Sequence, residues 1–327
     1  MSTSLSEATK QLHAAAVASL LAPSVFNTQP WHWRITGDTL ELFADPSRQV
    51  QSIDPNARLL LISCGVALHH ARTALTAAGW STTIDRLPDP TQPGLLARLR
   101  LGHQIPPDPE AQRMASAARR RRTDRRAFGA HPVSAAMLTR LRRFVEYEGA
   151  YLHVVPHDQI PMLAISTERA AGAEHDDPAY LEELEHWTNR PAWRGDGVSP
   201  DTAVQPTLRR VPVRDFTPEA NAGLTAGNGV DKGAAYLIIY GLSDQPADLL
   251  HGGEALSALL LLATAEGLAT APLSEAVEVA WPRHLLTTML ADIGEPYIAV
   301  RLGYRVNHEA LPAQVRRAPD EMITIEQ

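Results

Sequence analysis

The stretch from Ala22 to Trp31 constrains the fold of this chain more than any other, because two different periodicities meet at it. Before it, apolar residues recur at the spacing of one helix face, at Leu12, Ala16 and Leu20. Pro23 disfavours the α region for the residue before it, so we expect the helix to end near Leu21. After Pro30, apolar and polar residues alternate, which predicts a half-buried strand. Its apolar positions are Trp31, Trp33 and Ile35.

Four polar residues lie inside this helix-to-strand corner, namely Ser24, Asn27, Thr28 and Gln29. Short polar side chains at such a place either hydrogen-bond the backbone of the turn or face the polar edge of a ligand. Because asparagine and serine are ordinary turn residues, residue type alone favours the turn.

The order of residues in the corner resembles a motif of the flavin-binding nitroreductase family. In that family Ala-Pro-Ser, two variable residues and Asn-x-Gln-Pro-Trp occur together, and here they begin at Ala22. A corner followed by a strand with two tryptophans is most similar to the actinobacterial Acg-type branch. The resemblance implies an α+β, nitroreductase-like fold with FMN as cofactor. It also implies that Ser24, Asn27 and Gln29 meet the polar edge of the flavin ring, since each amide offers a donor and an acceptor.

A second segment, from Arg119 to Arg126, has six arginines in eight positions. Such a run is typical of a solvated surface or a nucleic-acid patch, but the net charge of −7 gives the chain no general attraction to nucleic acid. Part of the run is also similar to the Arg-x-Ser-x-Arg segment that binds phosphate in nitroreductases. The resemblance implies that Arg121, Arg122, Thr123 and Arg125 hold the FMN phosphate, together with Arg316 or Arg317. Paired guanidinium donors suit a dianion.

A third segment, from Gly267 to Glu275, is expected to be a loop. The family pattern places Thr270, Pro272, Leu273 and Ser274 along the flavin ring near its N5 atom. Because hydride chemistry belongs to the cofactor, we expect no catalytic acid or base. NAD(P)H would deliver the hydride, and a nitroaromatic or quinone-like acceptor would remove it.

An internal repeat relates two long apolar segments. Gly65-x-Ala67-Leu68 is followed by Gly79, and Gly253-x-Ala255-Leu256 is followed by Gly267, fourteen residues after the first glycine in both cases. Each segment later leads to Arg-Leu-Gly, at 100–102 and 301–303. Matching spacings suggest that one ancestral unit occurs twice. We therefore expect two tandem halves, residues 1–117 and 118–327.

The two halves differ in what they keep. Only the first has the helix-to-strand corner, and only the second has the arginine segment. Nitroreductases are homodimers that bind FMN between subunits, so the resemblance implies an intramolecular pseudo-dimer with one complete site. We expect a monomer with one flavin per chain.

Residues from about 176 to 232 show little periodicity but contain Trp187 and Trp193. A long irregular segment is either a functional cover or a packed structural insertion. Resemblance to the Acg-type branch implies a lid over the flavin. A closed lid would make the protein a flavin store instead of a reductase.

Composition limits the remaining function classes. The 327 residues suffice for two units of ordinary domain size, and the 44% apolar and 20% charged fractions are typical of soluble proteins. With Cys64 as the single cysteine, an intramolecular disulfide is impossible. Apolar runs are short for a membrane span, and Glu7 with a single Lys10 makes a poor secretory signal. We expect a cytoplasmic protein without nucleic-acid or membrane partners.

Two other enzyme classes find little support. A hydrolase would need a nucleophile elbow, and no Gly-x-Ser-x-Gly occurs. A metal site at Glu182, Glu183 and His186 lacks an accompanying Cys/His cluster. His69 and His70 are adjacent on one helix and point about 100° apart, so they do not favour a shared metal either.

Overall fold

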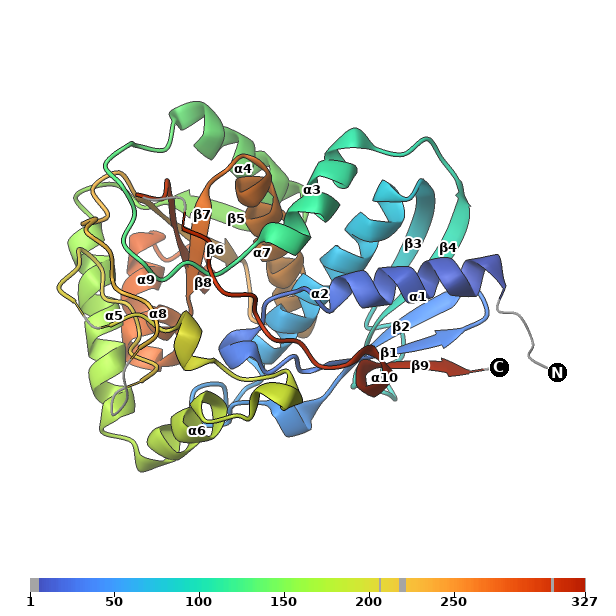
Figure 1. The fold of residues 1–327 in the computed structure, drawn as a ribbon, viewed down its shortest axis with the longest axis horizontal. Coiled ribbons are helices and arrows are strands. Elements are labelled where there is room, and N and C mark those ends of the chain that lie inside the picture. Colours follow the sequence, from blue (N-terminus) through green and yellow to red (C-terminus); the bar gives the residue numbers. More distant parts are fainter. Residues whose placement is uncertain (1–5, 206, 218–221, 307–308, 327) are drawn as a thin grey trace.

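The computed structural model describes residues 6–205, 207–217, 222–306 and 309–326, which form two β-sheets and the helices packed around them (Figure 1). This mixed α+β architecture agrees with the predicted fold class. The segment predicted as a lid includes residues 206 and 218–221, which lie outside the described residues, as do the first five residues of the N-terminal segment considered as a secretory signal.

The first sheet has five strands in the order β3-β4-β2-β1-β9. These strands are β1 (Trp31–Thr36), β2 (Thr39–Ala44), β3 (Trp80–Arg86), β4 (Leu95–Gln104) and β9 (Ile323–Glu326). All neighbours are antiparallel except β1 and β9, which pair in parallel with Trp33 opposite Ile323. The strand predicted after Pro30 is confirmed, and its alternation puts both tryptophan side chains in the core.

The second sheet has four antiparallel strands in the order β5-β6-β8-β7. These strands are β5 (Tyr151–Val154), β6 (Ala235–Gly241), β7 (Ala269–Leu273) and β8 (Glu295–Gly303). The prediction of a loop from Gly267 to Glu275 is therefore wrong for residues 269–273, which form β7. Because β7 pairs with β8 along its length, an edge strand forms where the short sequence, interrupted by Pro272, indicated a loop.

Helices surround and separate the sheets. They are α1 (Glu7–Ser19), α2 (Arg58–Ala77), α3 (Pro109–Arg120), α4 (Ala135–Tyr147), α5 (Ile160–His175), α6 (Pro178–Thr188), α7 (Pro246–Ala265), α8 (Glu275–Glu278), α9 (Ala280–Met289) and α10 (Pro319–Met322). Four short 3₁₀ segments cover Val25–Asn27, Pro46–Arg48, Ala192–Arg194 and Pro200–Thr202. The predicted lid therefore contains α6 and two 3₁₀ segments, instead of being irregular throughout.

The long helices α2 and α7 cross at the centre of the molecule (Figure 1). At the crossing, Gly65 of α2 faces Gly253 of α7, and a methyl group added at Gly65 would lie 2.9 Å from the Gly253 Cα atom. The same addition at Gly253 would lie 2.8 Å from the Gly65 Cα atom. The two glycines hold equivalent positions in the sequence repeat, and only glycine permits this backbone approach.

The C-terminal segment returns from the second sheet to the first. In Figure 1 the red chain passes across the molecule to α10 and ends as β9 beside β1. The sequence-based division at 117/118 falls within α3, and it assigns β9 to the second half although that strand completes the first sheet.

By length and composition, α2 is the one helix among the described residues that could cross a membrane, and 78% of its apolar window is buried inside the protein. Its ends are those of a packed core helix. The Asp54 carboxylate accepts hydrogen bonds from the backbone N–H groups of Leu59 and Leu60 at 3.0 and 2.9 Å, and Gly79 follows its end with φ +81°.

The helix crossing makes a testable prediction. Gly253→Ala is expected to lower the free energy of unfolding by about 1–3 kcal/mol or more, because its methyl group overlaps the backbone of α2. The control is Gly172→Ala in α5, where a Cβ meets nothing within 4 Å, and it should stabilise by about 0.5–1 kcal/mol. Urea unfolding measures both, and equal effects would contradict the close backbone approach.

Candidate cofactor site

The corner between α1 and β1 has an unusual backbone. Phe26, Asn27 and Gln29 have φ values of 44°, 54° and 50°, in the left-handed region that side chains other than glycine disfavour. Nearby hydrogen bonds hold this conformation. The Ser24 hydroxyl accepts from the Gln29 N–H at 2.8 Å, and the Ser63 hydroxyl accepts from the Val25 N–H at 3.3 Å. Strain kept in place by surrounding contacts is typical of functional sites.

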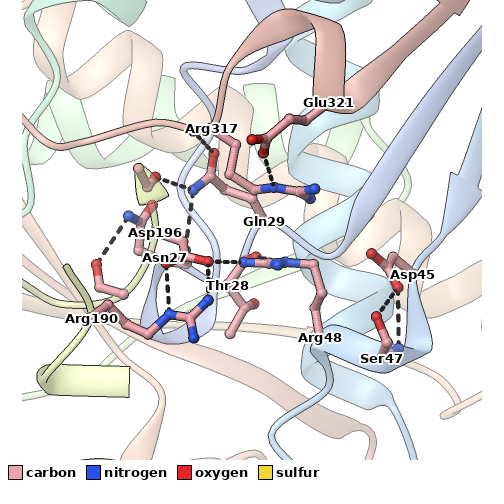
Figure 2. Close-up of polar contacts among 12 residues, drawn as sticks. Asn27, Thr28, Gln29, Asp45, Ser47, Arg48, Arg190, Asp196, Arg317 and Glu321 are labelled. Atoms are coloured by element: carbon pink, nitrogen blue, oxygen red, sulfur yellow. Dashed lines mark hydrogen bonds and ion pairs between the residues drawn. The ribbon is translucent and has the colours of Figure 1, made fainter. Parts of the chain in front are cut away.

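The two amides of the corner are used within the protein (Figure 2). Asn27 donates to the Gly197 and Val315 carbonyls at 3.0 and 3.2 Å, and its oxygen accepts from Arg316 at 2.9 Å. Gln29 donates to the Gly195 carbonyl at 2.8 Å and accepts from the Arg317 N–H at 3.1 Å. Both side chains thus fasten the corner to residues 195–197 and to the C-terminal segment. Their contact with a flavin ring stays a prediction.

An ion-pair cluster strengthens this connection (Figure 2). The buried Asp196 carboxylate pairs with Arg48, and with Arg190 at 2.7 Å. Although burial would raise the pKa of Asp196, hydrogen bonds from Arg190 and Arg48 lower it below its ordinary value. Arg48 also donates to the Thr28 carbonyl at 2.5 Å, so the cluster reaches the corner itself.

A cavity lies beside the corner, between α2, α7 and β7. Six of the residues predicted to bind the cofactor line it, namely Ser24, Thr123, Arg125, Pro272, Leu273 and Ser274. Sequence reasoning missed other lining residues, which include Ser63, Val66, Arg214 and Phe216. The cavity therefore has lining residues from both sides of the predicted division at 117/118. The pseudo-dimer itself stays a prediction.

Arg301 of β8 holds the backbone of the arginine segment in place. This fully buried side chain donates to the carbonyls of Asp124 and Arg126 at 3.0 and 2.9 Å and pairs with Asp231 at 2.7 Å. Thr123 also forms an isolated parallel bridge with Thr270. These contacts hold Thr123 and Arg125 at the cavity wall.

Three predicted phosphate ligands form a cationic cluster outside the lining of the cavity. We call Arg121, Arg122 and Arg316 the arginine cluster, and it adjoins the cavity where Arg121 approaches the Thr123 hydroxyl at 3.5 Å. Burial, and then repulsion from the other cluster arginines, lowers the pKa of Arg316 to about 9. The Nε atoms of all three arginines are buried and have no hydrogen-bond partner in the described part of the chain.

Arg317 lies apart from this cluster. Its side chain pairs with Glu321 at 3.3 Å, and its backbone N–H donates to the Gln29 side-chain oxygen (Figure 2). Of the two arginines named by the sequence analysis, Arg316 lies next to Arg121 and Arg122. Binding of phosphate by either one stays a prediction.

A strap from the predicted lid, residues 211–217, crosses the cavity. Its Arg214 guanidinium is buried and pairs with Glu278, with Glu174 at 3.3 Å and with Glu275 at 3.5 Å. The same group lies over the Phe26 ring at 5.0 Å, so the strap contacts the corner directly. Burial raises the pKa of Glu275 to about 7 and that of Glu174 far above its ordinary value. A lone arginine in an irregular segment gave no sequence signal for this arrangement.

Metal binding finds no support among the residues that the structure describes, since no group of three or more His, Cys, Asp or Glu side chains could hold an ion there. Glu183 instead accepts hydrogen bonds from the N–H groups of Gln51 and Ser52, each at 2.8 Å.

No family model matches the sequence. The relative named "Putative NAD(P)H nitroreductase Rv3131" from Mycobacterium tuberculosis H37Rv is 34% identical over 307 residues, which cover 92% of this chain and 88% of the relative. The chain belongs to the nitroreductase family. A second relative from the same strain, "Putative NAD(P)H nitroreductase acg", is 32% identical over 97% of this chain and 96% of the relative, in agreement with the Acg-type branch.

Solved nitroreductase structures align with about two thirds of the chain. The FMN-dependent nitroreductase NfnB from Mycobacterium smegmatis in complex with NADPH has 15% identity and a TM-score of 0.44, covering 67% of this chain and 100% of that one. The FMN and NADPH-dependent nitroreductase NfnB from "sphigopyxis sp. strain HMH" has 18% identity and a TM-score of 0.42, covering 65% of this chain and 99% of that one.

The ion-pair cluster at the corner predicts the effect of one substitution. Asp196→Asn leaves Arg48 and Arg190 without their carboxylate, and we expect a loss of about 3–5 kcal/mol in the free energy of unfolding. Glu321→Gln, which breaks the more exposed pair with Arg317, should cost less than about 1 kcal/mol. Chemical denaturation of both variants tests this, and a small effect of Asp196→Asn would show that the cluster does not hold the corner.

Proposed function

We propose that this member of the nitroreductase family binds one FMN per chain and acts as an NAD(P)H-dependent oxidoreductase. The observation that carries the proposal is the arginine cluster beside an apolar cavity. Arg121 is buried and Arg316 is half-buried with a buried Nε atom, and the charged groups that act on them are further arginines, without a carboxylate among those that the structure describes. Buried cations without a counter-ion are unfavourable, so a dianionic phosphate fits this place.

The remaining cavity fits the other end of such a cofactor. Its walls are largely apolar, from Leu59, Ile62 and Val66 of α2 and from Leu273 of β7. Ser24, Thr123 and Arg125 add polar groups at a few points, as in most cofactor sites. In our proposal, Arg125 and Thr123 orient the ring and its side chain, and the backbone of β7 lies along one ring face.

Bound FMN would supply the hydride transfer, and the chain would position the cofactor and keep water away from it. The described residues that line the cavity include no histidine, and Glu275 is engaged by Arg214. The proposed acceptor is a nitroaromatic or a quinone-like molecule. We also propose that the protein works as a monomer, because both halves of the chain already contribute to one cavity. The proposed location is the cytoplasm.

A flavin store is the second candidate, and the strap favours it. Arg214 and Phe216 line the same cavity, and Arg214 is held there by three buried carboxylates. If the strap stays closed over the ring, nicotinamide cannot reach it.

Anaerobic spectroscopy separates the two candidates. The purified protein loaded with FMN should lose its oxidised flavin absorbance when NADPH or NADH is added. Persistent colour with both nucleotides, followed by bleaching with dithionite, would show a reducible but inaccessible flavin and support storage.

Flavin affinity tests the assignment of the cavity. Arg125→Ala should weaken FMN binding by about 10- to 100-fold, the value of one or two charge-assisted hydrogen bonds. Arg119→Ala removes an exposed arginine from the same run and should leave the affinity unchanged. Titration by flavin fluorescence measures both, and equal affinities of the two variants would show that Arg125 does not take part in flavin binding.

The strap gives a further prediction for the reductase. Phe216 packs edge-on against Phe26, with ring centroids 5.5 Å apart, and Phe216→Ala should open the cavity and speed flavin reduction by NADPH. Trp193→Ala, which removes an 80% exposed side chain from the same insertion, is the matched control. Stopped-flow absorbance records the rates, and identical rates would mean that the strap does not limit access.

A further inference from the structure

His70 of α2 is a buried histidine with one unused nitrogen. Its Nδ1 atom lies 3.0 Å from the Val66 carbonyl and 2.9 Å from the Ser257 hydroxyl. A carbonyl only accepts, so Nδ1 carries the hydrogen and Nε2 has a free lone pair. That Nε2 atom is buried and has no hydrogen-bond partner among the described residues. A buried acceptor without a donor calls for an explanation.

His70 lies just beyond the end of the cavity. Four residues of α2 line the cavity, the last of them Val66, and His70 lies one turn further along the helix. With 1.5 Å of rise per residue, its Cα atom is about 6 Å beyond the end of the cavity wall. Leu256 of α7 lines the cavity as well, and the next residue is the His70 partner Ser257.

The arginine cluster occupies the same end. Arg316 donates to the Leu21 carbonyl at 3.0 Å, and Leu21 and His70 line one groove between α1, α2 and α3. Burial, then His69, Arg121 and Arg316 in turn, lowers the pKa of His70 well below its ordinary value. Arg119 and His13 line the groove too. His70 is therefore neutral, beside arginines that have no carboxylate partner in the described part of the chain, until an anion enters.

We infer that His70 is a further member of the phosphate site, and that one proton lies between its Nε2 atom and a phosphate oxygen when a phosphate monoester binds. This inference rests on the proposed FMN function. A phosphate monoester has its second pKa near about 6, so above that pH the free ligand is a dianion and the free histidine is neutral. The proton must then come from solvent, and no other bond is made or broken. A neutral flavin without phosphate needs no such proton.

Proton uptake makes FMN affinity depend on pH in a defined direction. Between pH 7 and 8.5 the FMN dissociation constant of the unaltered protein should rise about tenfold per pH unit, because each complex takes up one proton. Riboflavin, which has the ring but no phosphate, should bind with a constant affinity. Fluorescence titration of both flavins gives the ratio of the FMN and riboflavin dissociation constants at each pH. This readout does not depend on any enzyme activity.

Two variants locate the effect. His70→Gln keeps a donor that cannot titrate, so FMN should still bind, but the tenfold rise of the dissociation constant between pH 7 and 8 should be lost. His69→Gln is the matched control, because the neighbouring His69 lies 2.7 Å from Ser257 and 3.6 Å from Glu148, away from the arginine cluster, and it should retain the pH-dependent FMN preference. Circular dichroism confirms that each variant is folded before titration.

Calorimetry covers the case in which either variant fails to fold. FMN is titrated into the unaltered protein at pH 8 in two phosphate-free buffers with different ionisation enthalpies. The difference between the two observed binding enthalpies should correspond to uptake of about one proton. No proton uptake together with a pH-independent FMN-to-riboflavin ratio would overturn the role of His70 while leaving FMN binding intact. If neither flavin binds, the proposed function itself fails.

Discussion

The backbone contact between α2 and α7 is the constraint on which the rest of the structure depends. Because Gly65 and Gly253 have no side chain, the two helices approach closely enough for α2 and α7 to share one cavity wall. Each helix comes from a different half of the sequence repeat. A larger residue at either position would overlap the backbone of the other helix and push the two helices apart. The close approach at these two glycines thus brings together two of the walls that line the cavity.

Around that contact, buried polar side chains connect distant segments of the protein to one another. Asn27, Gln29 and Asp196 are buried, and each makes several hydrogen bonds or ion pairs to segments distant in sequence. Fully satisfied buried networks specify one arrangement, because any other arrangement leaves polar groups unpaired. The left-handed backbone of the corner is held in this way. The arginine cluster differs from these networks, since no carboxylate among the described residues neutralises its charges.

Sequence reasoning predicted the fold well where the signal was local or repeated. The corner, the strand from Trp31, the long helix through Gly65 and the family all follow from residues within a few turns of one another. The cavity unites Ser24, Thr123, Arg125 and Leu273, which the resemblance had assigned to one site.

What the sequence did not show depends on tertiary packing. Strand β7 was missed because its pairing with β8, and not its own composition, makes it a strand. The amides of Asn27 and Gln29 looked free because their partners lie at Gly197 and Gly195, far along the chain. Arg214 and His70 are single residues without a periodic pattern, so only the structure reveals the groups that surround them.

The return of the chain to its first sheet has a consequence for biosynthesis. Asn27 and Arg316 are joined although they are 289 residues apart, and β9 pairs with β1 only after almost the whole described chain has been made. Since translation proceeds from the N-terminus, the arginine cluster lacks Arg316 while the polypeptide is still emerging from the ribosome. An anionic ligand can therefore meet all three arginines only after synthesis has passed this point, and any loading of the protein belongs to its maturation and not to its early folding.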